Sequence, residues 1–191
     1  MTAAVGTTKR MKIYLAGPDV FELDPIAKGK MLKALCEKHG VEGLYPMDNE
    51  LSDAEHGSHA QAASIRSANM DLIMAADAII ANMAPFRGPS MDVGTAYEMG
   101  VAAALNKVVV GYTSDVRSYV SKVKDFHTVE RAPDGYLRDE QGMSVEEFNG
   151  IDGTAGSVDN LMIACGVERL CKTAEEAIQV AIELYKAQKT S

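Results

Sequence analysis

The sequence predicts a doubly wound α/β fold, in which a parallel sheet carries helices on both of its faces. Short apolar segments rich in β-branched residues alternate along the chain with longer segments of helical periodicity. This alternation is typical of a parallel sheet covered by helices. The chain has 191 residues, which fits one domain with a substantial core.

The first half of the chain supplies three expected strands and two helices. Residues 11–17, MKIYLAG, are apolar and end at a Gly-Pro pair, which predicts a buried first strand. Residues 26–39 carry apolar side chains at helical spacing and precede Gly40, a common helix stop. A short strand is expected in VEGLYP, residues 41–46. A helix over about 59–76 then leads to a strand at 78–82, AIIAN.

The second half supplies two more helices and one strand. Residues 93–105, VGTAYEMGVAAAL, predict a buried helix, and residues 108–112, VVVGY, a buried strand. The capping box Thr173-Ala-Glu-Glu176 opens a final amphipathic helix to about Lys186. Residues 113–157 are polar and irregular between these elements, and we expect a mobile loop or lid there.

The composition excludes several function classes. Asp and Glu number 27 against 19 Lys and Arg, which disfavours nucleic acid and anionic membranes as partners. Residues 1–10 are polar and contain no apolar core of a signal peptide, so we expect a disordered leader followed by a single domain over 11–191. No segment resembles a transmembrane span, and a cytoplasmic location is the expectation.

Neither a metal nor a cofactor is expected. The three cysteines are odd in number and lack a CxxC spacing, and the four histidines form no HxxxH or HExxH pattern. No GxGxxG or GxxxxGK[ST] motif follows any expected strand, which removes the usual dinucleotide and triphosphate sites. The absence of these motifs favours chemistry carried by the side chains themselves.

Glu98 is the only charged residue between Val93 and Leu105. A helix that is apolar all round is buried, and an unpaired buried carboxylate is costly. If Asp92 is the N-cap, Glu98 also lies beyond the capping positions. The alternative is that Glu98 turns onto a narrow solvated stripe of an Ala-rich helix.

Two further acids strengthen the chemical interpretation. Asp92 opens the same helix, and Asp71 lies in the mostly apolar SANMDLIMAAD. Paired carboxylates in surroundings of low polarity serve glycosidic-bond chemistry, one as nucleophile and one as proton donor. Asp92 as a helix cap and Asp71 as a surface residue remain the structural alternatives.

Asp92 and Glu98 directly follow the strand expected at 78–82, so they stand at the edge of the sheet where ligands bind in doubly wound folds, beyond the carboxyl ends of the strands. The loops expected at that edge include GPDVF at 17–21 and MAPFRGPSMD at 83–92. They supply four candidate substrate-binding residues, Gly17, Phe21, Arg87 and Gly88.

Four motifs, in order, resemble the nucleoside 2-deoxyribosyltransferases: YLAGPDVF, NMDLIMAADAIIANMAPFRG, DVGTAYEMG and DNLMIACG. The similarity runs from about Met11 to Lys186. The resemblance implies a flavodoxin-like sheet and the exchange of one nucleobase for another on 2-deoxyribose. It also implies a homo-oligomer, a dimer or larger, whose active sites are shared between subunits.

The resemblance assigns roles position by position. Glu98 matches the nucleophile, and Tyr14 matches the tyrosine that orients it and crowds the 2′ position. Asp71 and Asp92 match the acids that protonate the leaving base and hold the sugar hydroxyls. Asn160 matches a residue that reaches the 5′-hydroxyl from a neighbouring subunit, and Met162 of the same motif joins the substrate-binding candidates. The PFRG and NLM segments favour purine-accepting members.

Two other functions compete with the transferase. An N-glycoside hydrolase of deoxynucleosides or their 5′-monophosphates would need a phosphate site in the latter case, yet the first loop carries Asp19. A nucleotide-sensing module without turnover has no need for three carboxylates and a tyrosine.

Overall fold

The computed structural model describes residues 10–49 and 54–190. Apart from Arg10, the leader expected at residues 1–10 lies outside the described residues. Among the helices of these two ranges, none combines the length and the apolar character needed to cross a membrane.

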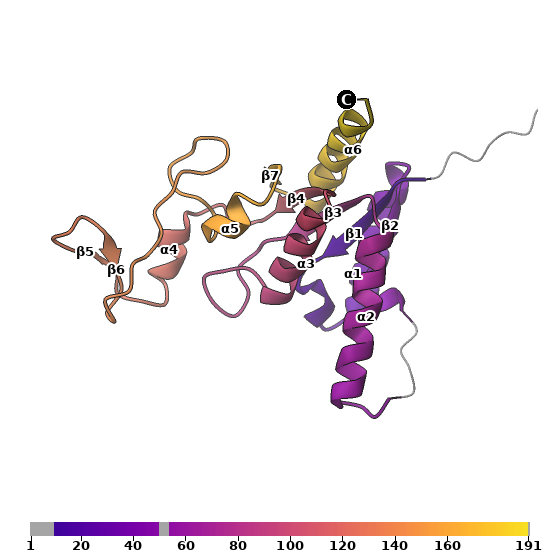
Figure 1. Ribbon diagram of the computed structural model, residues 1–191, viewed down its shortest axis with the longest axis horizontal. Coiled ribbons are helices and arrows are strands. Elements are labelled where there is room, and N and C mark those ends of the chain that lie inside the picture. The colour runs from indigo at the N-terminus through magenta and orange to yellow at the C-terminus, as the bar shows by residue number, and fades with distance from the viewer. Residues whose placement is uncertain (1–9, 50–53, 191) are drawn as a thin grey trace, which may run out of the picture.

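The centre of the molecule is a five-stranded sheet in which every neighbouring pair of strands is parallel. The order is β2-β1-β3-β4-β7 (Figure 1), which is the flavodoxin-like order. The strands are β1 (Lys12–Ala16), β2 (Glu42–Leu44), β3 (Ala78–Asn82), β4 (Val108–Tyr112) and β7 (Arg169–Cys171). The predicted flavodoxin-like, doubly wound fold is therefore confirmed.

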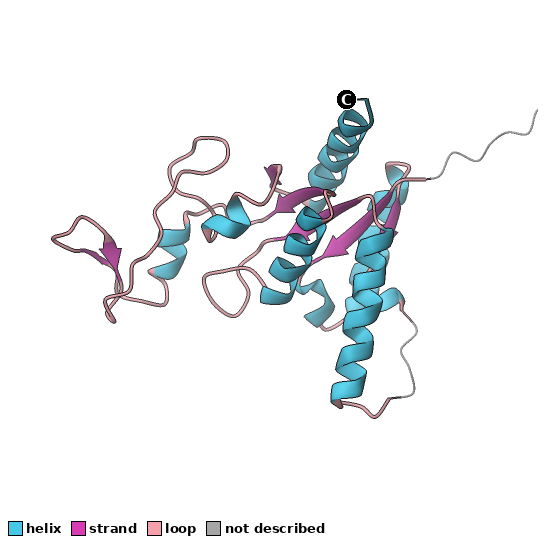
Figure 2. Cartoon of the chain, viewed as in Figure 1, coloured by secondary structure: helices cyan, strands magenta, loops and turns pink. Residues whose placement is uncertain are grey.

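Helices, drawn in cyan, cover the two faces of this sheet (Figure 2). One core cluster joins the sheet to α1 (Pro25–Lys38) and α6 (Ala174–Thr190). The other joins it to α2 (His59–Ala75) and α3 (Val93–Ala104). Both layers are needed because the central strands β3 and β4 are buried along almost their whole length.

Strand β1 divides its side chains between these two layers. Ile13 and Leu15 belong to the cluster with α1 and α6, whereas Tyr14 and Ala16 belong to the cluster with α2 and α3. This division follows from the two-residue period of a strand. It directs Tyr14 toward α3.

Helix α3 is fixed at both ends by local interactions. Asp92 caps its first turn, and Thr95, Met99 and Ala102 form its buried stripe. The helix ends at Ala104, and Asn106 then adopts a left-handed conformation with φ of 54°. Glu98 lies next to the buried stripe and is half-buried.

Residues 113–157 are more structured than the sequence indicated. They contain α4 (Tyr119–Val123) and an antiparallel pair, β5 (Glu130–Arg131) with β6 (Leu137–Arg138). This region extends away from the sheet in Figure 1, and exposed ion pairs such as Arg131 with Glu147 join its segments. The short helix α5 (Leu161–Ala164) follows.

Outside residues 113–157, most expected elements occur near their expected bounds, with two differences. Strand β7 was not expected, because its three residues offer only Leu170 and Cys171 as apolar side chains. The last helix continues to Thr190 rather than ending near Lys186, because no helix-stopping residue intervenes. Neither difference affects the carboxyl ends of β1 and β3, where the candidate site lies.

Candidate active site

The shortest polar contact of the candidate site joins β1 to α3. The Tyr14 hydroxyl donates a hydrogen bond to Oε1 of Glu98 at 2.7 Å. Tyr14 is completely buried, so the hydroxyl has little freedom to leave this carboxylate. The bond fixes one oxygen of Glu98 and thereby orients the other.

Burial changes the acidity of both partners. Loss of hydration raises the pKa of Glu98 to about 7, and the nearby Asp92 adds to this rise while the Tyr14 hydrogen bond opposes it. Burial, followed by the Glu98 charge, raises the pKa of Tyr14 well above its usual range. Tyr14 therefore keeps its proton and donates a hydrogen bond at neutral pH, whereas Glu98 gains or loses its proton near neutral pH. A carboxylate with such a pKa is typical of catalytic sites.

Asp92 has a structural role and a place in the same site. Its Oδ2 accepts hydrogen bonds from the backbone nitrogen of Thr95 at 2.8 Å and from the Thr95 hydroxyl at 2.9 Å. Asp92 is therefore the N-cap of α3, which was one of the two interpretations that the sequence allowed. Its charge also acts on Glu98, so the two carboxyl groups are electrostatically linked.

A cavity of about 320 Å³ opens in front of these carboxylates. The residues that line it come from the loops after β1 and β2 and from helices α2 and α3: Gly17, Val20, Phe21, Pro46, Met47, Ile65, Asn69, Asp92, Gly94, Thr95 and Glu98. It is thus largely apolar with a few convergent polar groups, as small-molecule sites usually are.

Gly17 allows two loops to approach each other at this cavity. A Cβ atom at this position would lie 2.8 Å from the Asn82 Cβ and 2.3 Å from Oδ2 of Asp19. Asn82 in turn donates to both carboxylate oxygens of the buried Asp19, at 3.3 and 3.2 Å. The absence of a side chain at Gly17 therefore keeps the ends of β1 and β3 close together.

With this geometry established, comparisons with known proteins identify the chain's relatives. The family model described as nucleoside 2-deoxyribosyltransferase matches residues 13–162. The chain belongs to the nucleoside 2-deoxyribosyltransferase family. The match covers β1, α2, β3 and α3, and therefore every element that lines the cavity.

Three individual proteins illustrate what the chain is similar to. A 2-deoxyribosyltransferase from Leishmania mexicana is 35% identical, with a TM-score of 0.67 over 91% of this chain and 97% of that one. A conserved protein from Enterococcus faecalis shares the fold at 20% identity, with a TM-score of 0.57 over 92% of this chain and 99% of that one. An uncharacterized protein of Schizosaccharomyces pombe is 38% identical over 117 residues, 60% of this chain but only 55% of that protein's length.

The structure places Asp71 apart from the other acids that the family resemblance singled out. Asp71 is exposed on α2 and is not among the residues that line the cavity, whereas Asn69 is. Helix geometry explains the difference: Asn69 is four residues before the buried Ile73 and shares its face, while Asp71 is two residues before it and points away. The position of Ile73 was a signal that could have identified Asn69.

The candidates Phe21, Arg87 and Gly88 lie at or beside the cavity. Phe21 stacks on Phe86 with ring centroids 5.3 Å apart, and the Arg87 guanidinium lies 4.6 Å from the Phe86 centroid and 5.3 Å from that of Phe21. Arg87 has a positive φ of 57°, a strained conformation for a residue with a side chain. Phe21 lines the cavity, whereas Arg87 and Gly88 line a neighbouring depression.

Asn160 and Met162 are not brought into this cavity by their own chain. Asn160 caps α5, accepting from the backbone nitrogen of Met162 at 3.0 Å and donating to Glu146 at 2.6 Å. Met162 is 77% exposed. The buried Asp159 next to them accepts from the backbone nitrogens of Met91, at 2.9 Å, and of Asn160, at 2.8 Å. This carboxylate therefore ties the start of α3 to the start of α5.

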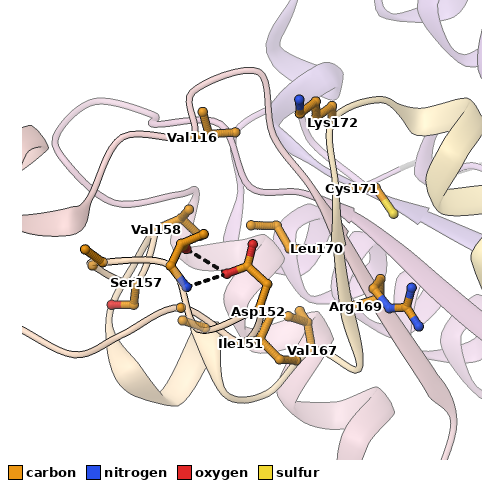
Figure 3. A pocket seen from close by; sticks show the side chains of 15 residues that line it. Val116, Ile151, Asp152, Ser157, Val158, Val167, Arg169, Leu170, Cys171 and Lys172 are labelled. Carbon is orange, nitrogen blue, oxygen red and sulfur yellow. Dashed lines mark hydrogen bonds between the residues drawn. The ribbon is translucent and has the colours of Figure 1, made fainter.

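A second cavity, of about 410 Å³, lies at the β7 edge of the sheet and is lined by neither Glu98 nor Asp92 (Figure 3). Its one carboxylate, Asp152, is occupied by the backbone nitrogen and hydroxyl of Thr154. Within the described ranges, no three metal-ligating side chains are clustered. The cavity in front of Glu98 is therefore the site best equipped for glycosidic-bond chemistry.

Proposed function

We propose that the protein transfers 2-deoxyribose between nucleobases, with purine acceptors favoured, through a covalent intermediate on Glu98. The observation that carries the proposal is the Tyr14–Glu98 hydrogen bond at the wall of a cavity that Asp92 also lines. Membership of the nucleoside 2-deoxyribosyltransferase family supports the same class of reaction.

In the first half-reaction, an oxygen of ionised Glu98 attacks the anomeric carbon C1′ while the bond from C1′ to the base nitrogen breaks. The bonding electrons leave with the base, which takes up the proton that Asp92 carries in the reactive, singly protonated form of the Asp92–Glu98 pair. The transition state resembles an oxocarbenium ion, which forms more readily on deoxyribose because the electron-withdrawing 2′-hydroxyl is missing.

In the second half-reaction, a different base attacks C1′ of the deoxyribosyl ester and returns its proton to Asp92, which releases Glu98. Two displacements at one carbon give net retention of configuration. Tyr14 has two roles in this scheme. Its hydroxyl orients Glu98, and its ring fills space near the sugar's 2′ position, which disfavours ribonucleosides.

A transferase must keep water away from the ester, and a second copy of the chain is proposed to help. Helices α3 and α5 border an apolar groove of about 580 Å³, lined in part by Met99, Leu161 and Met162. Val93, at the start of α3, is 83% exposed. A neighbour bound over this face would cover these side chains and bring its own Asn160 segment toward the site.

The decisive assay incubates deoxyinosine with free adenine and follows deoxyadenosine and free deoxyribose by chromatography. The transferase produces deoxyadenosine only when adenine is present, with little free sugar. Rapid release of hypoxanthine without any acceptor would instead identify an N-glycoside hydrolase. Binding of nucleosides without turnover would favour a sensing module. Glu98→Ala, which suits an Ala-rich helix, serves as the inactive control.

A further inference from the structure

The Asn69 side chain lines the cavity in front of Glu98, and the proposed mechanism does not use its polar groups. Its Oδ1 is enclosed and has no hydrogen-bond partner within residues 10–49 and 54–190. A buried amide oxygen without a donor is destabilising, and because such groups are few in native proteins, each one calls for an explanation. Asn69 also lines the cavity in front of Glu98, so a small rotation of its side chain would bring this enclosed oxygen within reach of a ligand's donor.

The position of Asn69 on α2 limits what it can contact. Ile65, four residues earlier, lines the same cavity, and Ile73, four residues later, is buried beneath it. The amide is therefore held on the face of α2 that meets the ligand. It presents one acceptor, the carbonyl oxygen, beside one donor, the NH₂ group. A 180° rotation of the amide group exchanges the positions of this oxygen and nitrogen. The recognition element is therefore the acceptor and donor taken together, and not either atom in a fixed place.

We propose that Asn69 selects 6-aminopurines by pairing with their N6–H donor and N7 acceptor. The inference rests on the proposed function, because it requires C1′ of a deoxynucleoside to lie against Glu98. Of the hydrogen-bond acceptor atoms on a purine, N7 belongs to the same five-membered ring as the glycosidic nitrogen. N7 is therefore close to C1′. An asparagine amide matches the N6/N7 edge of adenine with two hydrogen bonds.

The same geometry disfavours 6-oxopurines. Hypoxanthine and guanine present two acceptors, O6 and N7, along this edge. Asn69 can donate to only one of them, and its carbonyl oxygen then faces the other acceptor. A site whose buried polar group is left unpaired by a ligand rejects that ligand.

Asn69 is a specificity residue in this scheme and not an acid. A neutral amide has no proton to give at physiological pH, so the proton for the leaving base still comes from Asp92. A hydrogen bond from the Asn69 NH₂ group to N7 withdraws electron density from the ring as the glycosidic bond breaks. Recognition and assistance to the leaving group are thus exerted at the same purine atom.

Binding measurements separate this inference from the reaction. Glu98→Gln prevents turnover, and calorimetry on this variant compares deoxyadenosine with deoxyinosine. We expect deoxyadenosine to bind about 10- to 100-fold more tightly. Adding Asn69→Leu should reduce this ratio to within about three-fold of unity, mainly by weakening deoxyadenosine. The matched control is Ser67→Leu, which introduces the same side chain at an exposed position of α2.

An atomic probe tests the N7 contact. The analogue 7-deaza-2′-deoxyadenosine keeps the amino group but lacks the N7 acceptor, so it should bind about ten-fold more weakly than deoxyadenosine when Asn69 is present. With Asn69→Leu, the two should bind alike. Asn69→Ala, a helix-favouring change, gives the same comparison if the leucine variant does not fold.

The outcomes are distinguishable. Equal binding of deoxyadenosine and deoxyinosine, or a ratio unchanged by Asn69→Leu, overturns the role of Asn69 whatever the enzyme's reaction. Suppose instead that deoxyadenosine binds more tightly than deoxyinosine, that Asn69→Leu removes this preference, and that the wild-type chain yields free deoxyribose as its only sugar product. This result overturns the transferase and leaves base selection by Asn69 intact.

Discussion

The Tyr14 hydroxyl lies 2.7 Å from Oε1 of Glu98, although 84 positions separate the two residues in the chain. The contact exists because alternate side chains of β1 face α3, and because Glu98 lies beside the buried stripe of that helix. A central strand and a packed helix are rigid supports, so the carboxylate is oriented before any substrate binds.

Replacing Tyr14 with Phe should slow the reaction most at low pH. The pKa of Glu98 is about 7 because the rise caused by burial exceeds the lowering by the Tyr14 hydroxyl, so removal of the hydroxyl should shift the acidic limb of kcat/KM to higher pH. Rate profiles between pH 5 and 9 measure this shift. Discrimination against ribonucleosides should be largely kept because the ring remains. An unshifted limb would mean that the bond does not control the ionisation of Glu98.

Glu98→Gln should stabilise the fold above neutral pH. The raised pKa means that the folded state holds a proton that the unfolded state has released between about pH 4.5 and 7. Wild-type stability therefore falls relative to the variant as pH rises through this window. The difference should be negligible at pH 4 and reach roughly 1–3 kcal/mol above pH 7.

Urea denaturation at several pH values measures this difference. Glu183→Gln, an exposed glutamate on α6, is the matched control and should show no such trend. A constant difference from pH 4 to pH 8 would contradict the raised pKa of Glu98.

Asp92→Asn should separate the capping role from the chemical one. An asparagine oxygen can still accept from the Thr95 nitrogen, so stability should stay near wild type, but activity should fall about 100-fold or more without the proton donor. Asp92→Ala should lose about 1 kcal/mol of stability as well. Asp71→Asn makes the same change on the exposed side of α2, and activity should stay within about three-fold.

Mixing two impaired variants should restore activity if sites are shared between subunits. Asn160→Ser keeps an oxygen that can cap α5 but loses the amide, and Glu98→Gln loses the nucleophile. In a dimer, hybrids carry one intact site, so an equal mixture should recover about a quarter of wild-type activity. Light scattering on each variant checks that assembly is preserved. No recovery from properly assembled mixtures would place Asn160 outside the neighbour's site.

The sequence predicted the doubly wound sheet well because its strands are apolar runs and its helices are periodic. It also placed Glu98 and Asp92 on one helix, where the structure finds them. It was harder to predict which face of α2 meets the cavity. Asp71 was chosen because it is an acid, whereas Asn69 lines the cavity. Strand β7 was missed because pairing with β4, rather than its own composition, defines it. Long-range contacts, which local patterns do not contain, account for β7, whereas the helical spacing from Ile73 already indicated which face of α2 is turned inward.

The Asp159 carboxylate accepts one backbone N–H with each of its oxygens, from Met91 and from Asn160. An asparagine of the same shape has a single acceptor oxygen and would turn its NH₂ group toward a second donor. Even this most conservative replacement would leave a buried amide hydrogen unpaired, because Asp159 is completely enclosed. Mutational tolerance at position 159 should therefore be lower than at either acid of the cavity, where Asn or Gln would inactivate the protein but let it fold.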